Sequence, residues 1–308
     1  MRSATDYSQA EKTEEKMMPT VTVVRQSAGD SADVKSHYDR VGWKETSAGV
    51  AEDTVRFGVR ENGPIRSAAH LRRLDRIRTM LHNAGEHHTI IECGCGGNPA
   101  LSIAGEFKKY IGMDFSTSGL AMAKQRAEAA QGKTHSLQTQ FIETNLTSLP
   151  LKDSSVDAVY TAHVLYHIPL ADGQRQALQE MMRVLKPGGV AVIIVANPTP
   201  LLFPIRALRR ITAAIPGIRQ LADALRKSPP LPYLPLSIGW MKRTLRPYGH
   251  VDVSAYAVPS IWFNQHVSER GLIGRLLWKL LDWIERSFPR ASARLGNFVM
   301  YTVRRSSH

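Results

Sequence analysis

The feature that most restricts the fold is a regular alternation of apolar runs and amphipathic segments between residues 89 and 196. The short apolar runs predict strands, and the segments between them show the three- and four-residue apolar spacing of helices. We expect strands at 89–92, 109–113, 140–143, 156–161 and 190–196, and helices at 67–81, 100–107, 116–130 and 172–185. Strands that alternate with helices indicate a parallel sheet with right-handed crossovers.

The sequence changes character on both sides of this core. Helix 172–185 should stop at Lys186-Pro187-Gly188-Gly189, because proline and glycine do not extend a helix. Further on we expect a helix at 238–245, strands at 251–257 and 297–304, and an amphipathic helix at 271–288 between them. The predicted regions are a mobile lead and N-terminal cap (1–66), a core (67–198), a helical, proline-rich lid (199–250), and two closing strands with an inserted helix (251–308).

Composition is that of an ordinary globular protein, with 43% hydrophobic and 22% charged residues. The cysteines, Cys93 and Cys95, are too close for an ordinary disulfide and lack the second pair of a zinc site. We therefore predict no metal site and a reducing, cytoplasmic location. The polar first twenty residues predict no secretory signal.

Positive charge is concentrated at one end of the chain. Residues 201–308 carry 17 Lys and Arg against 5 Asp and Glu, whereas the remainder carries 23 against 22. A basic third suggests a phosphorylated substrate, nucleic acid or an acidic membrane surface, and a merely basic solvated surface is the alternative.

A glycine-rich turn follows the first predicted strand, at Cys93-Gly94-Cys95-Gly96-Gly97. Glycines there let backbone amides approach a ligand closely. About twenty residues on, Asp114 ends the second strand, where an acid accepts hydrogen bonds from ribose hydroxyls. A plain tight turn, and a helix N-cap at Asp114 or Ser116, are the structural alternatives.

Three more segments follow in order: 141–160, 163–168 and 183–189. Together the five segments resemble the class I S-adenosylmethionine-dependent methyltransferase family, in its small-molecule branch. The resemblance covers residues 88–198. It implies an α/β, Rossmann-like, doubly wound seven-stranded sheet with an antiparallel last strand, plus helical N-terminal and C-terminal additions.

The resemblance also implies S-adenosyl-L-methionine as cofactor and assigns its site. The first turn would shape the pocket for the methionine end of the cofactor through Glu92, Gly94, Cys95 and Gly96. Ala162 and His163 would line the same end.

For the nucleoside end, Asp114 would hold the ribose and Phe115 would pack on the adenine. Asn145 stands where the family usually has an Asp for the adenine amine, and its carbonyl can accept the same hydrogen bond. Leu146 would supply a backbone amide to the ring, and Tyr38 would close the site from the N-terminal segment.

Methyl transfer to a hydroxyl also needs a base. His167 is the first candidate and His163 the second, because both follow the fourth strand at the carboxyl edge of the sheet. The alternative for each is a structural histidine at the start of the next helix. Residues 162–165 lack the Asn/Asp-Pro-Pro-aromatic tetrapeptide of enzymes that methylate the amino groups of bases.

The predicted acceptor is a small molecule, hydrophobic and lipid-like or phosphorylated, with transfer to oxygen favoured over nitrogen or carbon. An RNA methyltransferase is one alternative, although no RNA-binding module is recognised in the sequence. A non-catalytic module that binds an anionic membrane through the basic C-terminal third is another. A nicotinamide-dependent oxidoreductase fits the motifs less well.

Overall fold

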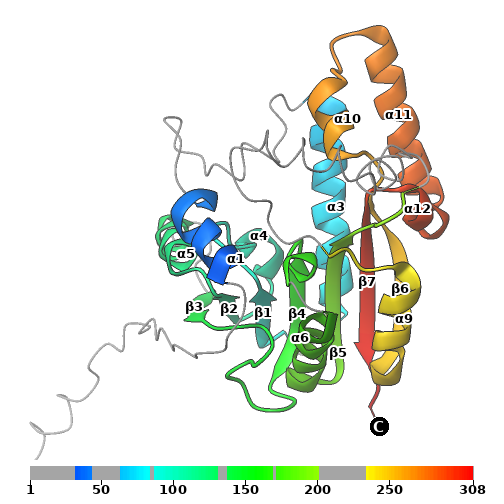
Figure 1. Cartoon of the computed structure of the whole chain (residues 1–308). Coiled ribbons are helices and arrows are strands. Elements are labelled where there is room, and N and C mark those ends of the chain that lie inside the picture. Colours follow the sequence, from blue (N-terminus) through cyan, green and yellow to red (C-terminus); the bar gives the residue numbers. More distant parts are fainter. Residues whose placement is uncertain are drawn as a thin grey trace, which may run out of the picture.

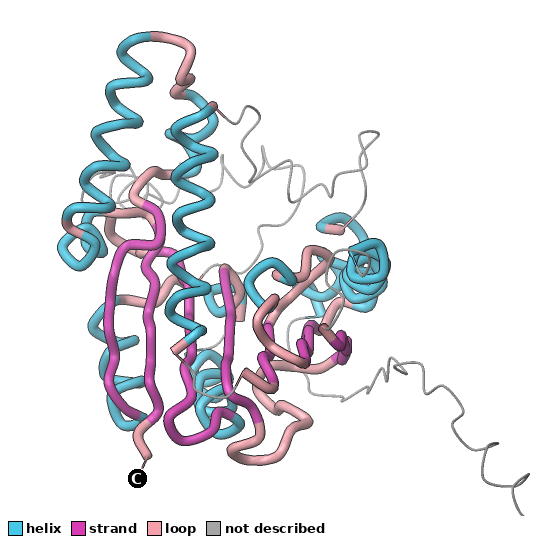
Figure 2. The backbone as a smooth tube through the Cα atoms, turned by 180° about the vertical axis from the view of Figure 1, so that it is seen from behind, coloured by secondary structure: helices cyan, strands magenta, loops and turns pink. Residues whose placement is uncertain are grey.

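The computed structural model describes residues 32–43, 63–83, 87–130, 137–168, 171–200 and 234–307. They form a seven-stranded sheet in the order β3-β2-β1-β4-β5-β7-β6 (Figures 1 and 2). Strands β1 to β5 run parallel, and β7 is antiparallel to both of its neighbours. The predicted fold class is therefore confirmed. The strands are β1 Thr89–Cys93, β2 Lys109–Asp114, β3 Gln138–Glu143, β4 Val156–Ala162, β5 Leu185–Ala196, β6 Gly249–Ala257 and β7 Phe298–Arg305.

Helices cover both faces of the sheet. One buried apolar cluster joins the sheet to α3, α4 and α5, and a second joins it to α6, α9 and α12. The described helices are α1 Ala32–His37, α3 Pro64–His82, α4 Leu101–Ala104, α5 Thr117–Ala130, α6 Ala171–Val184, α9 Ile238–Leu245, α10 Ile261–His266, α11 Leu272–Ser287 and α12 Pro289–Leu295. Three short turns complete them: η1 Tyr38–Gly42, η2 Leu165–His167 and η3 Arg246–Tyr248.

Most predicted elements are present with small shifts at their ends, but the start of β5 is a correction. Lys186-Pro187-Gly188-Gly189, predicted to separate a helix from a strand, belongs to the strand itself. Leu185 pairs with Val156 and Val190 with Ala158, so the four residues form a bulge. Gly188 takes a φ of +76°, which glycine tolerates better than other residues.

One face of α3 also differs from expectation. The apolar spacing predicts that Leu71 faces the core, yet its side chain is 64% exposed. The buried positions include Arg66, which pairs with Glu269 across the fold. The sequence did not predict α10 and α12.

Parts of the predicted lead and lid, residues 1–31, 44–62 and 201–233, lie outside the described residues, and the region boundaries stay predictions. Within the described part of the chain, no helix combines the length and apolarity needed to cross a membrane.

Candidate functional site

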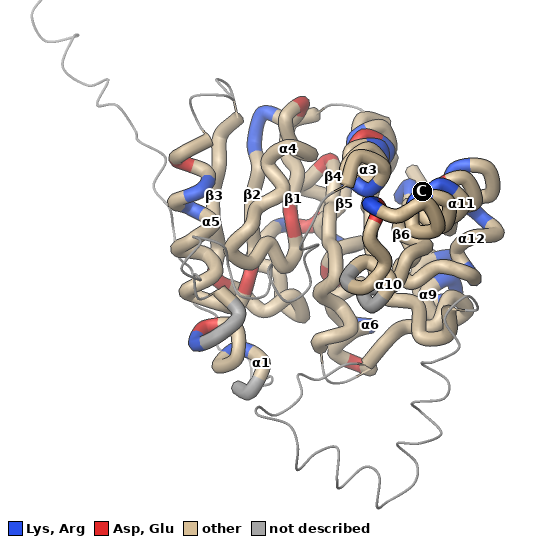
Figure 3. The backbone as a smooth tube through the Cα atoms, turned by 90° about the horizontal axis from the view of Figure 1, so that it is seen from above, with Lys and Arg blue, Asp and Glu red and all other residues tan. Residues whose placement is uncertain are grey.

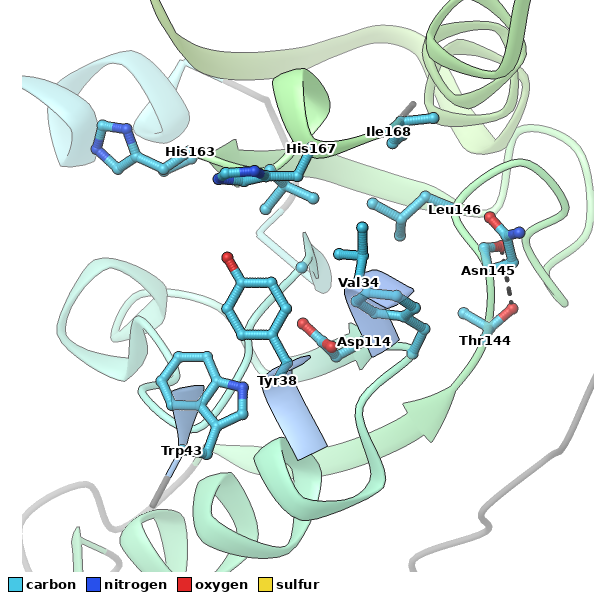
Figure 4. A pocket seen from close by; sticks show the side chains of 14 residues that line it. Val34, Tyr38, Trp43, Asp114, Thr144, Asn145, Leu146, His163, His167 and Ile168 are labelled. Atoms are coloured by element: carbon cyan, nitrogen blue, oxygen red, sulfur yellow. Dashed lines mark hydrogen bonds between the residues drawn. The ribbon is translucent and has the colours of Figure 1, made fainter. Parts of the chain in front are cut away.

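A cavity of about 210 Å³ lies at the edge where the parallel strands end (Figure 4). Three groups of residues line it. From the N-terminal segment come Val34, Tyr38 and Trp43; from the ends of β1, β2 and β3 come Gly94, Asp114, Phe115, Thr144, Asn145 and Leu146; from the end of β4 and η2 come Ala162, His163, Val164, His167 and Ile168.

The glycine turn after β1 is shaped by two left-handed residues, Gly94 with φ +81° and Gly96 with φ +50°. A Cβ on Gly94 would lie 2.2 Å from a methyl carbon of Val164, and one on Gly96 would lie 2.0 Å from the indole of Trp43. Both positions therefore need glycine for conformation and for space.

Asp114, the last residue of β2, ties this turn to the second strand. Its carboxylate oxygens accept hydrogen bonds from the amide of Gly96 at 2.8 Å and the amide of Ser116 at 2.9 Å. Burial raises the pKa of Asp114 to about 6, although these amide hydrogen bonds act in the opposite direction. Each oxygen keeps a lone pair for a further donor in the cavity.

Glu92, Cys95 and Gly96 do not line the cavity. The Glu92 carboxylate lies behind the turn, where it accepts hydrogen bonds from the Tyr110 hydroxyl and, at 2.8 Å, from the amide of Ala100. Burial raises the pKa of Glu92 to about 7. These contacts brace the turn from its far side.

Asn145 and its neighbours form the end of the cavity next to β3. The side-chain oxygen of Asn145 accepts the amide of Thr147 at 3.0 Å, and the Thr144 hydroxyl donates to the Asn145 carbonyl at 3.3 Å (Figure 4). These bonds fix the loop with Asn145 and Leu146 at the cavity wall.

The N-terminal segment is fastened to the junction of β2 and α5. The Lys35 ammonium donates to the Phe115 carbonyl and lies 3.3 Å from a carboxylate oxygen of Glu143. The Ser116 hydroxyl donates to Asp39 at 2.7 Å. Burial disfavours the Asp39 carboxylate, but hydrogen bonds from Ser116 and its neighbours hold its pKa below the ordinary value.

Tyr38 projects from this segment into the cavity, and its hydroxyl points toward His167 in Figure 4. The two ring centres are 6.3 Å apart, edge to face, and the Tyr38 ring stacks on Trp43 with centres 6.0 Å apart. The sequence predicted Tyr38 at this position but not Val34 and Trp43. For Trp43, the only signal in the sequence is an aromatic residue near glycines. For Val34, the sequence offers no signal.

The two histidines after β4 have different surroundings. The His167 ring faces the cavity, whereas the His163 ring points away from Tyr38 (Figure 4). The centre of the His163 ring lies 4.6 Å from that of Phe298, and its Nδ1 has no hydrogen-bond partner among the described residues. Burial, assisted by His167, lowers the pKa of His163 to about 4, so its imidazole is neutral at pH 7.

Residues 91–193 match the family model described as a methyltransferase domain. A demethylmenaquinone methyltransferase of Oceanobacillus iheyensis is 35% identical over 130 residues, which cover 41% of this chain and 52% of that protein. A demethylmenaquinone methyltransferase of Bacillus mycoides is 37% identical over 115 residues, or 35% and 46% of the two chains. The chain thus spans about half the length of the curated relatives it matches.

Among solved structures, the N-methyltransferase NodS of Bradyrhizobium japonicum, in complex with S-adenosyl-L-homocysteine, superimposes with a TM-score of 0.50 at 14% identity. The match covers 83% of this chain and 93% of NodS. At this identity the likeness concerns the fold alone. The matched model and the sheet order lead to one conclusion: residues 91–193 of this chain form a methyltransferase domain, within a seven-stranded sheet in which β7 is antiparallel to its neighbours.

Proposed function

We propose that this protein transfers the methyl group of S-adenosylmethionine to a small, hydrophobic acceptor. The observation that carries the proposal is a cavity whose lining is mostly apolar and aromatic but includes one buried carboxylate. Asp114 lies beside the glycine turn, and Val164, Ile168 and the ring of Tyr38 belong to the same lining. The carboxylate suits the hydroxyls of a nucleoside, and the apolar side chains suit an acceptor with little charge.

Part of the lining fits the cofactor on its own chemistry. Gly94 lines the cavity with backbone alone, and Asp114 keeps lone pairs for ribose hydroxyls. Phe115 presents a ring beside the Asn145 loop, as an adenine site requires. Glu92 and Cys95 would act indirectly, since they support the turn from behind.

When bound, S-adenosylmethionine supplies an electrophilic methyl carbon on its sulfonium. The protein has to align the acceptor with that carbon and exclude water, which accounts for roughly 7–11 kcal/mol in well-oriented reactions. Val34, Tyr38 and Trp43 cover the cavity from the N-terminal side and would exclude water. His167, whose ring faces the cavity, would take the proton from an acceptor hydroxyl.

The cavity wall favours a hydrophobic acceptor over a phosphorylated one. None of the described lining residues is Lys or Arg, the side chains that pair with phosphate. The name of the curated relatives gives demethylmenaquinone, a quinone with a lipid tail, as their acceptor. We therefore propose a lipid-like aromatic acceptor, with transfer to oxygen as the prediction to be tested.

The fold alone does not fix the reaction. The [4+2]-cyclase SpnF superimposes with the same TM-score of 0.50, at 19% identity over 82% of this chain and 88% of SpnF. Cofactor binding and methyl transfer therefore need separate tests.

Cofactor binding is tested by calorimetric titration of the full chain with S-adenosylmethionine and S-adenosylhomocysteine. Asp114→Asn keeps the shape but removes a charged acceptor, a change of about 1.5–3 kcal/mol, so affinity should fall by about 10- to 100-fold. Asp75→Asn, at an exposed carboxylate on α3, is the matched control. Absence of binding by the folded wild-type protein would refute the proposal.

Methyl transfer is tested with isotope-labelled S-adenosylmethionine and a reduced naphthoquinone that carries a short prenyl tail. His167→Gln should lower kcat by about 10²- to 10⁴-fold, with little change in cofactor affinity, if His167 is the base. His250→Gln, an exposed histidine on β6, is the control. An unchanged kcat would remove His167 from the mechanism, and NMR of the product decides whether oxygen or carbon receives the label.

A further inference from the structure

Exposed apolar side chains are concentrated on one helix. Nine large hydrophobic side chains are exposed among the described residues, and seven of them belong to α11 and the residue that follows it. These seven, which we call the α11 apolar face, are Leu272, Ile273, Leu276, Leu277, Leu280, Trp283 and Phe288, with exposed fractions from 39% to 74%. Clustering on this scale marks an interaction site rather than scattered surface residues.

The face is separate from the side of α11 that packs on the protein. On the inward side, Trp278 is buried, donates its indole N–H to the Val267 carbonyl at 2.8 Å and packs against Phe263. The outward residues Ile273, Leu276, Leu280 and Trp283 recur every three or four positions, which places them on one stripe. The helix therefore has one apolar side that packs within the fold and another that is exposed.

The charges around this face all have one sign at the surface. The three acidic residues between 259 and 296 lie in ion pairs: Glu269 with Arg66, Asp282 with Arg72, and Glu285 with Arg73. These carboxylates are between 4% and 12% exposed. The exposed charged side chains of the same stretch are cationic, namely Arg270, Arg275, Lys279, Arg286, Arg290 and Arg294. Figure 3 marks Lys and Arg positions in blue along the backbone of α11 and α12.

A partner for this surface must be apolar and negatively charged. A second copy of α11 would bring like charges together, which disfavours a symmetric contact. Residues 201–233 of this chain carry six Lys and Arg against one Asp, so they do not complement the surface either. An anionic lipid bilayer offers both properties at once.

We propose that the α11 apolar face docks this protein on an anionic lipid bilayer. The sixteen-residue helix would lie in the membrane plane, with its leucines and Trp283 among the acyl chains and Arg275 and Lys279 near the headgroups. In Figure 1, α10 and α11 extend beyond the edge of the sheet at which β1 and β4 end, and α11 lies on the side of the molecule away from α1.

The proposal is tested by sedimentation of the full chain with vesicles, without cofactor or acceptor, so that its outcome is independent of the proposed methyl transfer. One vesicle population contains phosphatidylcholine alone, and the other also contains phosphatidylglycerol. Binding to the anionic vesicles should fall by about tenfold or more in Leu276→Ser/Leu280→Ser, because two exposed apolar anchors are lost. Arg275→Gln/Lys279→Gln should weaken binding to the anionic vesicles only.

Lys108→Gln/Lys124→Gln removes two exposed charges from another part of the surface and is the matched control, expected to bind as wild type. Circular dichroism checks that each variant is folded. Three results would overturn the proposal. The first is that the wild type does not sediment with anionic vesicles. The second is that the leucine variant binds them as well as the wild type does, which would mean that the protein adsorbs by charge alone, and the third is that light scattering finds the wild type to be a dimer and the leucine variant a monomer.

Discussion

Glu92 shows how a single buried carboxyl group can set the pH dependence of stability. Its folded-state pKa is about 7, against an ordinary value of 4.5, because burial disfavours the carboxylate. Below pH 4.5 Glu92 is protonated in both the folded and the unfolded protein. As pH rises toward 7, the unfolded state ionises first, so the free energy of unfolding falls.

Glu92→Gln mimics the protonated group and should remove this fall. Between pH 4.5 and 7, the wild type should lose up to about 3 kcal/mol relative to Glu92→Gln, from about 1.4 kcal/mol per unit of pKa. Urea unfolding at a series of pH values measures the difference. His163 acts in the opposite direction, since its depressed pKa of about 4 makes stability fall as pH drops below 6.5.

The comparison between variants separates these effects, because His163 and Asp114 titrate in both proteins. Glu106→Gln, at a carboxylate that is 57% exposed, should keep the wild-type pH dependence. If Glu92→Gln and wild type have parallel stability profiles, Glu92 does not carry this effect.

At the same scale, the sequence placed Asp114 in the site because its position follows a local rule, about twenty residues after a glycine turn. It also placed Glu92 there. Sequence does not tell whether the side chain of a strand residue faces a ligand or packs inside the protein, and the structure shows that Glu92 contacts Tyr110. Lys35 and Asp39 could not have been found, since their partners are about 80 residues away.

At the scale of elements, α3 and α11 are joined by arginine–carboxylate pairs rather than by leucines. Arg73 and Glu285 form two hydrogen bonds of 2.7 Å, and their side chains are 16% and 7% exposed. Glu285 also accepts the amide of Val258 at 3.1 Å. Charges buried to this degree are stable only as a pair.

Arg73→Met should therefore destabilise the protein by about 3–5 kcal/mol, because it leaves the Glu285 carboxylate buried without its partner. Urea unfolding gives the value. Arg72→Ala, which breaks the more exposed pair with Asp282, should cost about 1 kcal/mol or less. Addition of Glu285→Gln to Arg73→Met should restore part of the loss, and equal losses for Arg72→Ala and Arg73→Met would contradict this account.

These pairs explain why the helix pattern of α3 was only partly predictive. The apolar spacing located the helix, but it assigned Leu71 to the core and the arginines to solvent. Arg66 and Arg73 are mostly buried because each pairs with a carboxylate, and these carboxylates, Glu269 and Glu285, are about 200 residues away in sequence. The bulge at the start of β5 was missed for a related reason. Proline and glycine at positions 187 and 188 predict an end of regular secondary structure, whereas pairing with β4 keeps these residues in the strand.

At the scale of the molecule, the cavity is assembled from three parts of the chain that are far apart in sequence. They are residues 34–43, the ends of β1 to β3, and residues 162–168. Two of these parts follow from the strand and helix pattern. The third depends on contacts of Lys35 and Asp39 across the fold, so only its aromatic residue Tyr38 was predicted.

A ligand in this cavity should stabilise all three parts together. At 100 times its dissociation constant, S-adenosylhomocysteine adds about 2.7 kcal/mol to the folded state. Hydrogen exchange should slow in residues 34–43 as well as in the turns after β1 and β4, whereas exchange in α11 and α12 should not change.

Asp39→Asn weakens the link to Ser116, so protection of residues 34–43 should diminish while that of the turns remains. If wild-type protection stops at the turns, the N-terminal segment is not part of the cofactor site, and Tyr38 and Trp43 cover the cavity only in the ligand-free protein.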